Sequence, residues 1–198
     1  DGDSDSAFIE LGTGVFQIED DGPDAVVDPD ATPETLVLDE TRPVGTETDG
    51  DSDPAGLKTV TAAFADNFIT TIDYGTDGPG SVAYSLDLSA NGIGSGLYAL
   101  GAGGAQGAEI LLSQSGNIIT GSVGTTDYFT IEIDPSTGVV TFDQLNNVWH
   151  ADGTDDDDTS TLTLDGAGEH LRVVQTVTDA DGDSDSAFIE LGTGVFQI

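Results

Sequence analysis

Cysteine and methionine are absent from this sequence, and only three of its 198 residues are lysine or arginine. Without cysteine, the chain can form neither a disulfide nor a thiolate metal site. The three cations, Arg42, Lys58 and Arg172, are too few to build a basic patch, so the composition excludes nucleic acid as a partner and disfavours an anionic membrane surface. The longest apolar stretches are only a few residues, and we therefore expect no direct insertion into a membrane.

Acidic residues are abundant instead: 38 aspartates and glutamates give a formal net charge of −35. Divalent cations are the obvious counter-charge. Adaptation to high salt is the alternative explanation, and it would spread acids, glutamate included, over all outward strand faces. Here the outward positions are mostly serine and threonine, whereas aspartate is concentrated in loops, and this distribution favours coordination of cations.

One stretch occurs twice, because residues 1–18 and residues 181–198 are identical. Identity at a fixed spacing indicates a tandem array whose repeat is a whole domain. We therefore interpret residues 1–18 as the tail strand of a preceding repeat and 19–33 as an acidic, proline-rich linker between repeats. Residues 34–198 then form one complete domain. Its expected partners are neighbouring identical repeats, and the chain is expected to be monomeric in solution. The first copy is too apolar to be free in water, so we expect it to lie on an exposed edge of the sandwich or to contact a neighbouring molecule.

The domain is predicted to be all-β. Residues 81–89 and 128–133 alternate apolar and small polar side chains, which is the period of a half-buried strand. Shorter alternating segments follow up to residue 177, and residues 186–198 are expected to be the last strand. Glycines separate these segments, as turns require. We predict a two-sheet β-sandwich enlarged by long loops or extra strands, with residues 92–107 as the expected insertion.

The main candidate metal site is the loop just before that last strand. It carries four aspartates that alternate with small residues: Asp179, Asp181, Asp183 and Asp185. Alternate carboxylates on a tight loop can converge on one point, and Ca²⁺ takes six to eight oxygen ligands there. The glycine position and the flanking strands differ from those of an EF-hand. We therefore predict several structural Ca²⁺ ions.

The linker is expected to contribute to the same site. In an elongated array the chain enters a domain at one pole and leaves at the other, so the loop before the last strand lies where the linker arrives. Acids of the linker should then share Ca²⁺ with the loop: Glu19, Asp20, Asp21 and Asp24.

Three further acidic clusters are weaker candidates, because a bare run of acids is usually a solvated loop. The second-tier cluster is Asp49, Asp51 and Asp53. The incomplete first copy of the main loop contains Asp1, Asp3 and Asp5. The least organised cluster contains Asp152, Asp155 and Asp157.

Catalysis has little support in the sequence. His150 and His170 are the only histidines, and neither belongs to a nucleophile or zinc motif. We expect that the protein is not an enzyme.

Three motifs resemble the large extender repeats of RTX adhesins, which are giant bacterial surface proteins exported by type I secretion. They are Glu-Asp-Asp-Gly-Pro (19–23), Tyr-Gly-Thr-Asp-Gly-Pro-Gly-Ser-Val-Ala-Tyr-Ser-Leu (74–86) and Val-Thr-Asp-Ala-Asp-Gly-Asp-Ser-Asp-Ser-Ala (177–187). The resemblance implies an Ig-like antiparallel β-sandwich in an extracellular stalk at the bacterial cell surface. It also implies Ca²⁺ at the junctions and a role in cell adhesion and biofilm formation. The glycine-rich nonapeptides that give RTX proteins their name are absent.

A second functional class stays open. The domain could be a ligand-binding module of the same adhesin, for a carbohydrate or another surface. Repetition of identical sequence favours the extender, because a stalk gains length from copies whereas a binding tip needs only one.

Overall fold

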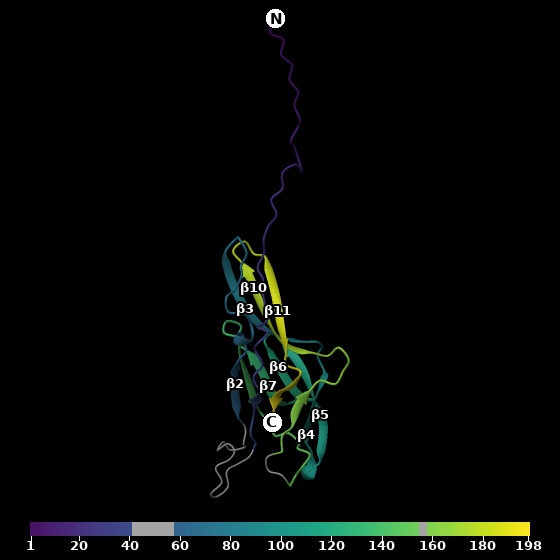
Figure 1. Ribbon diagram of the computed structural model, residues 1–198. Coiled ribbons are helices and arrows are strands. Elements are labelled where there is room, and N and C mark those ends of the chain that lie inside the picture. The colour runs from purple at the N-terminus through teal and green to yellow at the C-terminus, as the bar shows by residue number, and fades with distance from the viewer. Residues whose placement is uncertain (41–57, 155–157) are drawn as a thin grey trace.

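A computed structural model describes residues 1–40, 58–154 and 158–198, and it is built almost entirely of strands (Figure 1). Two short 3-10 helices, η1 (Ala65–Asn67) and η2 (Ala102–Gly104), are the only helices in the described residues, so none there is long and apolar enough to cross a membrane. The described strands are β1 (Leu36–Val37), β2 (Thr59–Ala63), β3 (Pro79–Leu88), β4 (Ile93–Leu100), β5 (Gln106–Ser115), β6 (Ile118–Val123), β7 (Thr126–Ile133), β8 (Val139–Gln144), β9 (Thr161–Thr163), β10 (Leu171–Asp179), β11 (Ser184–Glu190) and β12 (Thr193–Gln197).

The strands form one six-stranded sheet and two three-stranded sheets. The large sheet has the order β2-β8-β7-β6-β5-β4, and the small sheets have the orders β11-β10-β3 and β1-β12-β9. Every strand pair is antiparallel except β1 with β12. Short turns suit this pattern; between β7 and β8, for example, Asp134 Oδ1 accepts hydrogen bonds from the backbone N–H groups of Ser136 and Thr137.

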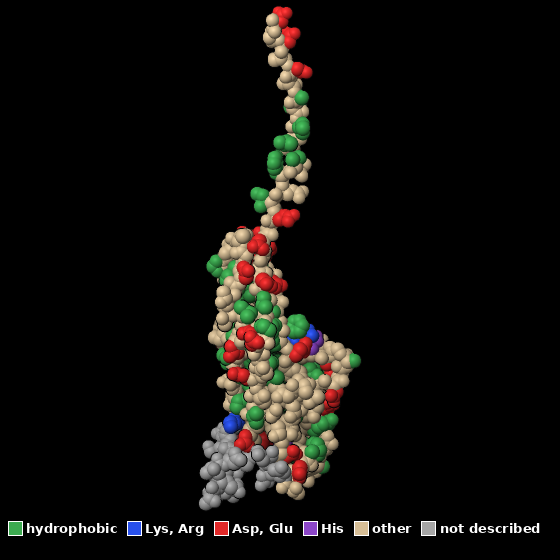
Figure 2. All heavy atoms as spheres, viewed as in Figure 1, with side chains coloured by type: hydrophobic (Ala, Val, Ile, Leu, Met, Phe, Trp, Pro, Cys, Tyr) green, Lys and Arg blue, Asp and Glu red, His purple; other side chains and the backbone are tan. Residues whose placement is uncertain are grey.

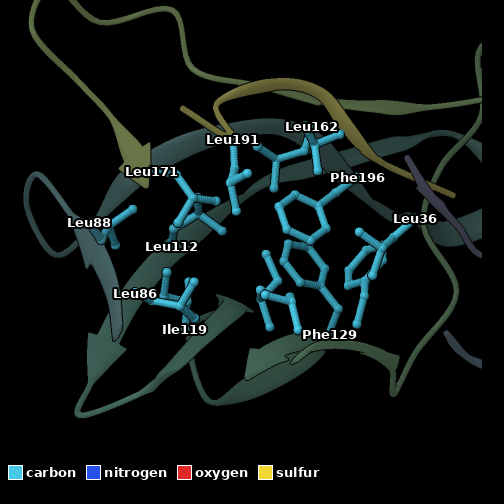
Figure 3. Close-up of a cluster of buried hydrophobic side chains, with 14 of the residues drawn as sticks. Leu36, Leu86, Leu88, Leu112, Ile119, Phe129, Leu162, Leu171, Leu191 and Phe196 are labelled. Atoms are coloured by element: carbon cyan, nitrogen blue, oxygen red, sulfur yellow. The ribbon is translucent and has the colours of Figure 1, made fainter. Parts of the chain in front are cut away.

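Side chains from all three sheets meet in one hydrophobic core (Figure 3). Its aromatic centre is Phe142 of β8, whose ring lies edge-on to Phe129 at 5.5 Å and to Phe196 of β12 at 5.1 Å between centroids. Since Phe142 and Phe196 belong to different sheets, this contact joins the large sheet to a small one. The prediction of an all-β sandwich enlarged by extra strands is confirmed.

The alternation in the sequence locates individual strands well. In β7 the expected inward residues Phe129, Ile131 and Ile133 are all buried. The insertion expected at residues 92–107 is β4 with the start of β5, and these strands pair with each other at the edge of the large sheet.

The prediction that residues 186–198 form a single last strand is wrong. The segment forms β11, which pairs with β10, and then β12, which pairs with β1 and β9 in the other small sheet. Leu191 and Gly192 separate the two strands, and Leu191 is buried while its N–H donates to the carbonyl of Leu171 at 2.7 Å. The chain therefore changes sheets in the middle of the duplicated sequence, and both strands supply core residues.

The first copy of that sequence extends away from the sandwich (Figures 1 and 2). Its apolar side chains are exposed, including 77% of Phe16 and all of Ile18. The prediction that the first copy lies on an edge of the same sandwich is therefore wrong. Its contact with another molecule stays a prediction.

Part of the predicted linker, residues 19–33, packs on the domain. Asp24 and Val27 form β-bridges with Asp73 and Phe68, and Ala25 is buried. Residues 24–28 thus lie on the domain.

We expect Phe142→Ala to lower the free energy of unfolding by about 3–5 kcal/mol, because it removes the ring that joins the large sheet to the sheet of β12 and leaves a cavity. Urea denaturation at a constant Ca²⁺ concentration measures this. Phe188→Ala is the control, since 48% of Phe188 is exposed, and the expected loss there is about 1 kcal/mol or less. Equal losses in the two variants would contradict a core centred on Phe142.

Candidate metal centre at the linker pole

The loop between β10 and β11 is closed by the side chain of its first aspartate. Asp179 Oδ1 accepts hydrogen bonds from the backbone N–H groups of Gly182 at 2.9 Å and Asp183 at 2.8 Å. The N–H of Asp179 donates to the carbonyl of Asp183 at 3.0 Å. Gly182 has a φ of 110°, a conformation that glycine adopts without strain. These contacts turn the chain tightly enough to bring neighbouring carboxylates together.

Asp179 is also buried in an unusual way. Only 3% of the residue is exposed, and its second oxygen, Oδ2, is fully buried without a hydrogen-bond partner among the described residues. A buried carboxylate oxygen with no partner is unfavourable by several kcal/mol unless a hydrogen bond or a cation compensates it. A bound cation would be one such compensation for the buried Oδ2 of Asp179.

Carboxylates converge here in two groups that share one member. Asp20, Asp181 and Asp183 form one group, and Asp77, Asp179 and Asp181 form the other. Within each group the candidate ligand oxygens all lie within 4.8 Å of one another. We call the first the outer group, because it includes the linker residue Asp20, and the second the inner group, because it lies wholly within the domain.

The electrostatics of these groups reflect crowding of negative charge. The carboxyl of Asp20, through a hydrogen bond and through its charge, raises the pKa of Asp77 to about 6, with smaller effects from Asp181 and Asp179. A hydrogen bond with Asp179 is the main cause that raises the pKa of Asp181. Burial would raise the pKa of Asp179, but hydrogen bonds from the loop outweigh burial and the pKa is lowered. A bound cation would relieve this repulsion, and oxygen-only ligands suit Ca²⁺ or Mg²⁺.

The linker is also attached to this pole by hydrogen bonds. The N–H of Ala25 donates to Asp185 Oδ2 at 2.9 Å, and the N–H of Asp24 donates to the carbonyl of Asp73 at 3.0 Å. Gly75, with a φ of 70°, lies so close that a Cβ there would clash with the carbonyl of Asp21. These contacts hold the backbone of residues 21–25 beside the acidic loop.

The structure thus brings the linker to the predicted loop, although not through every predicted residue. Asp20, Asp179, Asp181 and Asp183 lie in the two groups. Asp185 anchors the linker backbone and belongs to neither group. Three predicted linker acids are exposed and outside both groups: Glu19, Asp21 and Asp24.

Among the described residues, the weaker candidates do not join this site. Asp1, Asp3 and Asp5 are exposed in the N-terminal extension. Asp152 Oδ1 instead accepts hydrogen bonds from the N–H and hydroxyl of Thr154. The remaining candidates lie outside the described residues: Asp49, Asp51, Asp53, Asp155 and Asp157.

Sequence reasoning missed Asp77. It lies in the Gly-Thr-Asp-Gly-Pro-Gly turn before β3, far from the acidic loop in sequence. The pairing of β3 with β10 places Pro79 opposite Asp179, and Asp77 is two residues before Pro79. An acid in a glycine-rich turn was the available signal, but the register that makes it useful is a tertiary feature.

A second polar cluster surrounds Glu40, away from the candidate metal centre. Its carboxylate accepts hydrogen bonds from Gln144, from Asn147 at 2.9 Å and from the N–H of Val148 at 2.8 Å. His150 Nε2 lies 3.7 Å from Glu40 Oε2. Burial would raise the pKa of Glu40, but the neighbouring His150 and the hydrogen bonds outweigh burial and lower it. Glu40 in turn raises the pKa of His150 against the opposing effect of burial.

A cavity of about 400 Å³ lies beside β3 and η1. Its walls are mostly apolar, with Val82, Ile69 and Ile72 among them, and its polar edge includes Tyr84 and Gln175. The amide of Gln175 already donates to the hydroxyl of Tyr84 at 3.1 Å. A small ligand would fit in this cavity.

A family of proteins described as a domain of unknown function (DUF5801) matches residues 35–192 of the chain. No curated protein and no solved structure matches the chain.

We expect Gly75→Ala to detach the linker from the pole, because the new methyl group would displace the carbonyl of Asp21. Hydrogen exchange of the Asp24 and Ala25 amides measures this, and both should lose protection by tenfold or more, equivalent to about 1.4 kcal/mol. Gly78→Ala is a matched control, since Gly78 also has a positive φ but a Cβ there would meet no atom within 4 Å. Equal loss of protection in both variants would attribute the effect to backbone strain alone.

The Glu40–His150 pair should stabilise the fold most between about pH 4.5 and 6.5, the ordinary pKa values of the two groups. Because the pKa of His150 is raised, its contribution is complete below 6.5 and is lost as pH rises through the folded value. Because the pKa of Glu40 is lowered, its contribution is complete above 4.5 and is lost as pH falls through the folded value.

A double-mutant cycle with Glu40→Gln and His150→Gln isolates this pair from the other acids of the chain. We expect a coupling of about 1 kcal/mol near pH 5.5 that falls toward zero above the folded pKa of His150. A coupling that is the same across this range would refute a charged pair.

Proposed function

Because the chain belongs to the family described as a domain of unknown function (DUF5801), we propose its function from its own site: a calcium-stabilised structural extender domain of a giant secreted surface adhesin. In this proposal Ca²⁺ rigidifies the junction between tandem repeats, at the bacterial cell surface, in cell adhesion and biofilm formation. Type I secretion would export the parent protein. The neighbouring repeats are its structural partners, and catalysis has no part in this role.

The observation that carries the proposal is the meeting of Asp20 with Asp181 and Asp183. Asp20 comes from the linker, whereas the other two belong to the loop between β10 and β11. An ion bound by these three residues would tie the segment that precedes the domain to the domain itself. A junction held in this way fixes the orientation of one repeat relative to the next, as a stalk requires.

The inner group supports a second ion. Asp77, Asp179 and Asp181 all belong to the domain, and the buried Oδ2 of Asp179 lacks a partner in the described structure. An ion at the inner group would compensate that oxygen and hold Asp181, the shared residue, for the outer group. We therefore propose that the inner group is occupied first and the outer group second.

Electrostatic repulsion makes the fold depend on these ions. Two carboxylates about 4 Å apart repel by about 1–4 kcal/mol, depending on the effective dielectric. Several such pairs are comparable to the whole stability of a domain, about 5–15 kcal/mol. Extracellular modules bind Ca²⁺ with dissociation constants of about 10⁻⁴–10⁻³ M, so the domain would be loose in the cytosol and rigid outside the cell.

The duplicated sequence agrees with a stalk. Two identical copies of residues 181–198 in one chain indicate that the repeat is copied as a unit. Length that grows by copying is useful to an extender.

The alternative proposal is a ligand-binding module, for a carbohydrate or another surface, in the same adhesin. The cavity beside β3 is the observation that favours it. Its polar atoms are few, and Tyr84 and Gln175 already bind each other. A specific hit for this chain on a glycan array, lost in Val82→Trp, would favour this alternative over the extender.

We expect millimolar Ca²⁺ to raise the free energy of unfolding by about 1–3 kcal/mol or more, which calorimetric titration and melting curves in Ca²⁺ and in chelator will measure. Asp179→Asn keeps an oxygen that can accept the loop hydrogen bonds but removes the buried charge. This variant should be at least as stable as the wild type in chelator and should gain little from Ca²⁺. Asp77→Asn should behave in the same way.

Asp20→Asn should lose only the outer ion, so the gain in stability with Ca²⁺ falls partly and the protection of the Ala25 amide no longer increases with Ca²⁺. Asp127→Asn is the control for charge alone, because Asp127 is exposed on β7 and belongs to neither group. An unchanged melting temperature of the wild type in millimolar Ca²⁺ would refute the proposed function.

A further inference from the structure

We propose that the free edge of β3, together with the cavity beside it, binds an extended peptide segment of another protein that carries a large apolar side chain and basic neighbours. The peptide adds a strand to the small sheet and inserts its apolar side chain into the cavity. This inference does not depend on the Ca²⁺ site, and it assigns the cavity to a peptide instead of the carbohydrate of the alternative proposal.

β3 is an end strand of its sheet in the described structure, so one of its edges has no neighbouring strand (Figure 1). Along most of that edge, other groups satisfy the backbone. The N–H of Tyr84 donates to the carbonyl of Pro135 at 2.9 Å. The side-chain amide of Gln114 accepts from the N–H of Leu88 at 2.8 Å and donates to the carbonyl of Leu86 at 2.6 Å. Residues 84, 86 and 88 therefore direct their backbone groups away from β10.

Val82 is the exception on this edge. Backbone groups alternate in direction along an antiparallel strand, and the shift in register lies beyond the pair of Val82 with Val177, so the N–H and C=O of Val82 point the same way as those of Tyr84. In the described part of the chain, no other segment forms a hydrogen bond with them. An edge strand with an unpaired N–H and C=O is a template for an added strand.

The cavity of about 400 Å³ includes the same residue in its walls. Val82 and Tyr84 line it from β3, while Ala63, Ile69 and Ile72 line it from other segments. Residues directly opposite each other on neighbouring strands point to the same face of a sheet. The side chain that lies opposite Val82 on an added strand would therefore enter the cavity.

The size and walls of the cavity define the side chain that it takes. Its volume is at the lower end of the range for ligand sites, about 300–1,000 Å³, which suits one or two large aliphatic side chains. Its mostly apolar walls disfavour a sugar, because hydroxyl groups buried there would lose their hydrogen bonds to water. We therefore expect an apolar anchor such as leucine.

Charge defines the residues beside that anchor. Asp66 is exposed and also lines the cavity, and the chain as a whole carries a formal net charge of −35. An acidic peptide is repelled by this field, whereas a basic one is attracted. A second copy of this chain is disfavoured as the partner for the same reason, so the peptide belongs to another protein and has lysine or arginine near its anchor.

The probe is a synthetic peptide, Lys-Thr-Leu-Thr-Lys, acetylated and amidated at its ends. An NMR titration of the full chain at a constant millimolar Ca²⁺ concentration measures its binding. With saturating peptide, the amide of Val82 should gain protection from hydrogen exchange by tenfold or more, whereas the amide of Ala83, which faces β10, should change much less. Serine in place of leucine should weaken binding at least tenfold, and glutamate in place of both lysines should also weaken it.

Two substitutions at Val82 separate the backbone contact from the fold. Val82→Pro removes the N–H at the free edge without removing a hydrogen bond to β10, and proline is tolerated on edge strands. This variant should unfold cooperatively and bind the leucine peptide at least tenfold more weakly. Val82→Thr keeps the N–H and a side chain of similar shape, so it should bind nearly as tightly as the wild type. If Val82→Pro does not fold, Ile72→Trp fills the cavity from another segment and should cause the same loss.

Absence of binding would overturn the proposal, and so would equal binding of the leucine and serine peptides. If N-acetyl-leucine amide binds as tightly as the peptide and leaves the Val82 amide unprotected, the cavity is a small-molecule site and the strand addition is wrong. Failure of the Ca²⁺ function would appear in the melting temperature and not in these peptide titrations.

Discussion

Repulsion among carboxylates at one pole of the sandwich is the constraint on which the rest of the structure depends. Asp77, Asp179 and Asp181 are drawn together by the pairing of β3 with β10, and Asp20 is added by the linker. Burial of Asp179 Oδ2, which has no hydrogen-bond partner among the described residues, makes this arrangement unfavourable unless a cation compensates it. In the proposed function, folding, ion binding and the direction of the linker are therefore coupled at this pole.

The core supplies stability that is independent of that pole. Phe142 joins the large sheet to β12, and the two small sheets cover the same layer of apolar side chains. Because β11 and β12 are consecutive in sequence but belong to different small sheets, the end of the domain ties the acidic pole to the aromatic centre.

The duplicated sequence has two environments in one chain. Next to β10 it forms the outer strand of a three-stranded sheet and part of the core, whereas at the N-terminus it is extended and exposed. The same thirteen residues are thus able to complete a fold or to remain unpaired, and the neighbouring strands decide between these states.

The sequence by itself determined the fold class, the strands with clear alternation, the acidic loop and its meeting with the linker. Alternation of side chains is a local property, and the order of the elements along the chain is enough to place the linker beside the acidic loop. Tertiary structure alone decided that Asp77 joins the site, that Asp185 binds the linker backbone, and that residues 186–198 are two strands in two sheets. These outcomes depend on the register between distant strands and on the sheet that each strand enters. No local pattern encodes either, because register is set by the packing of the whole core.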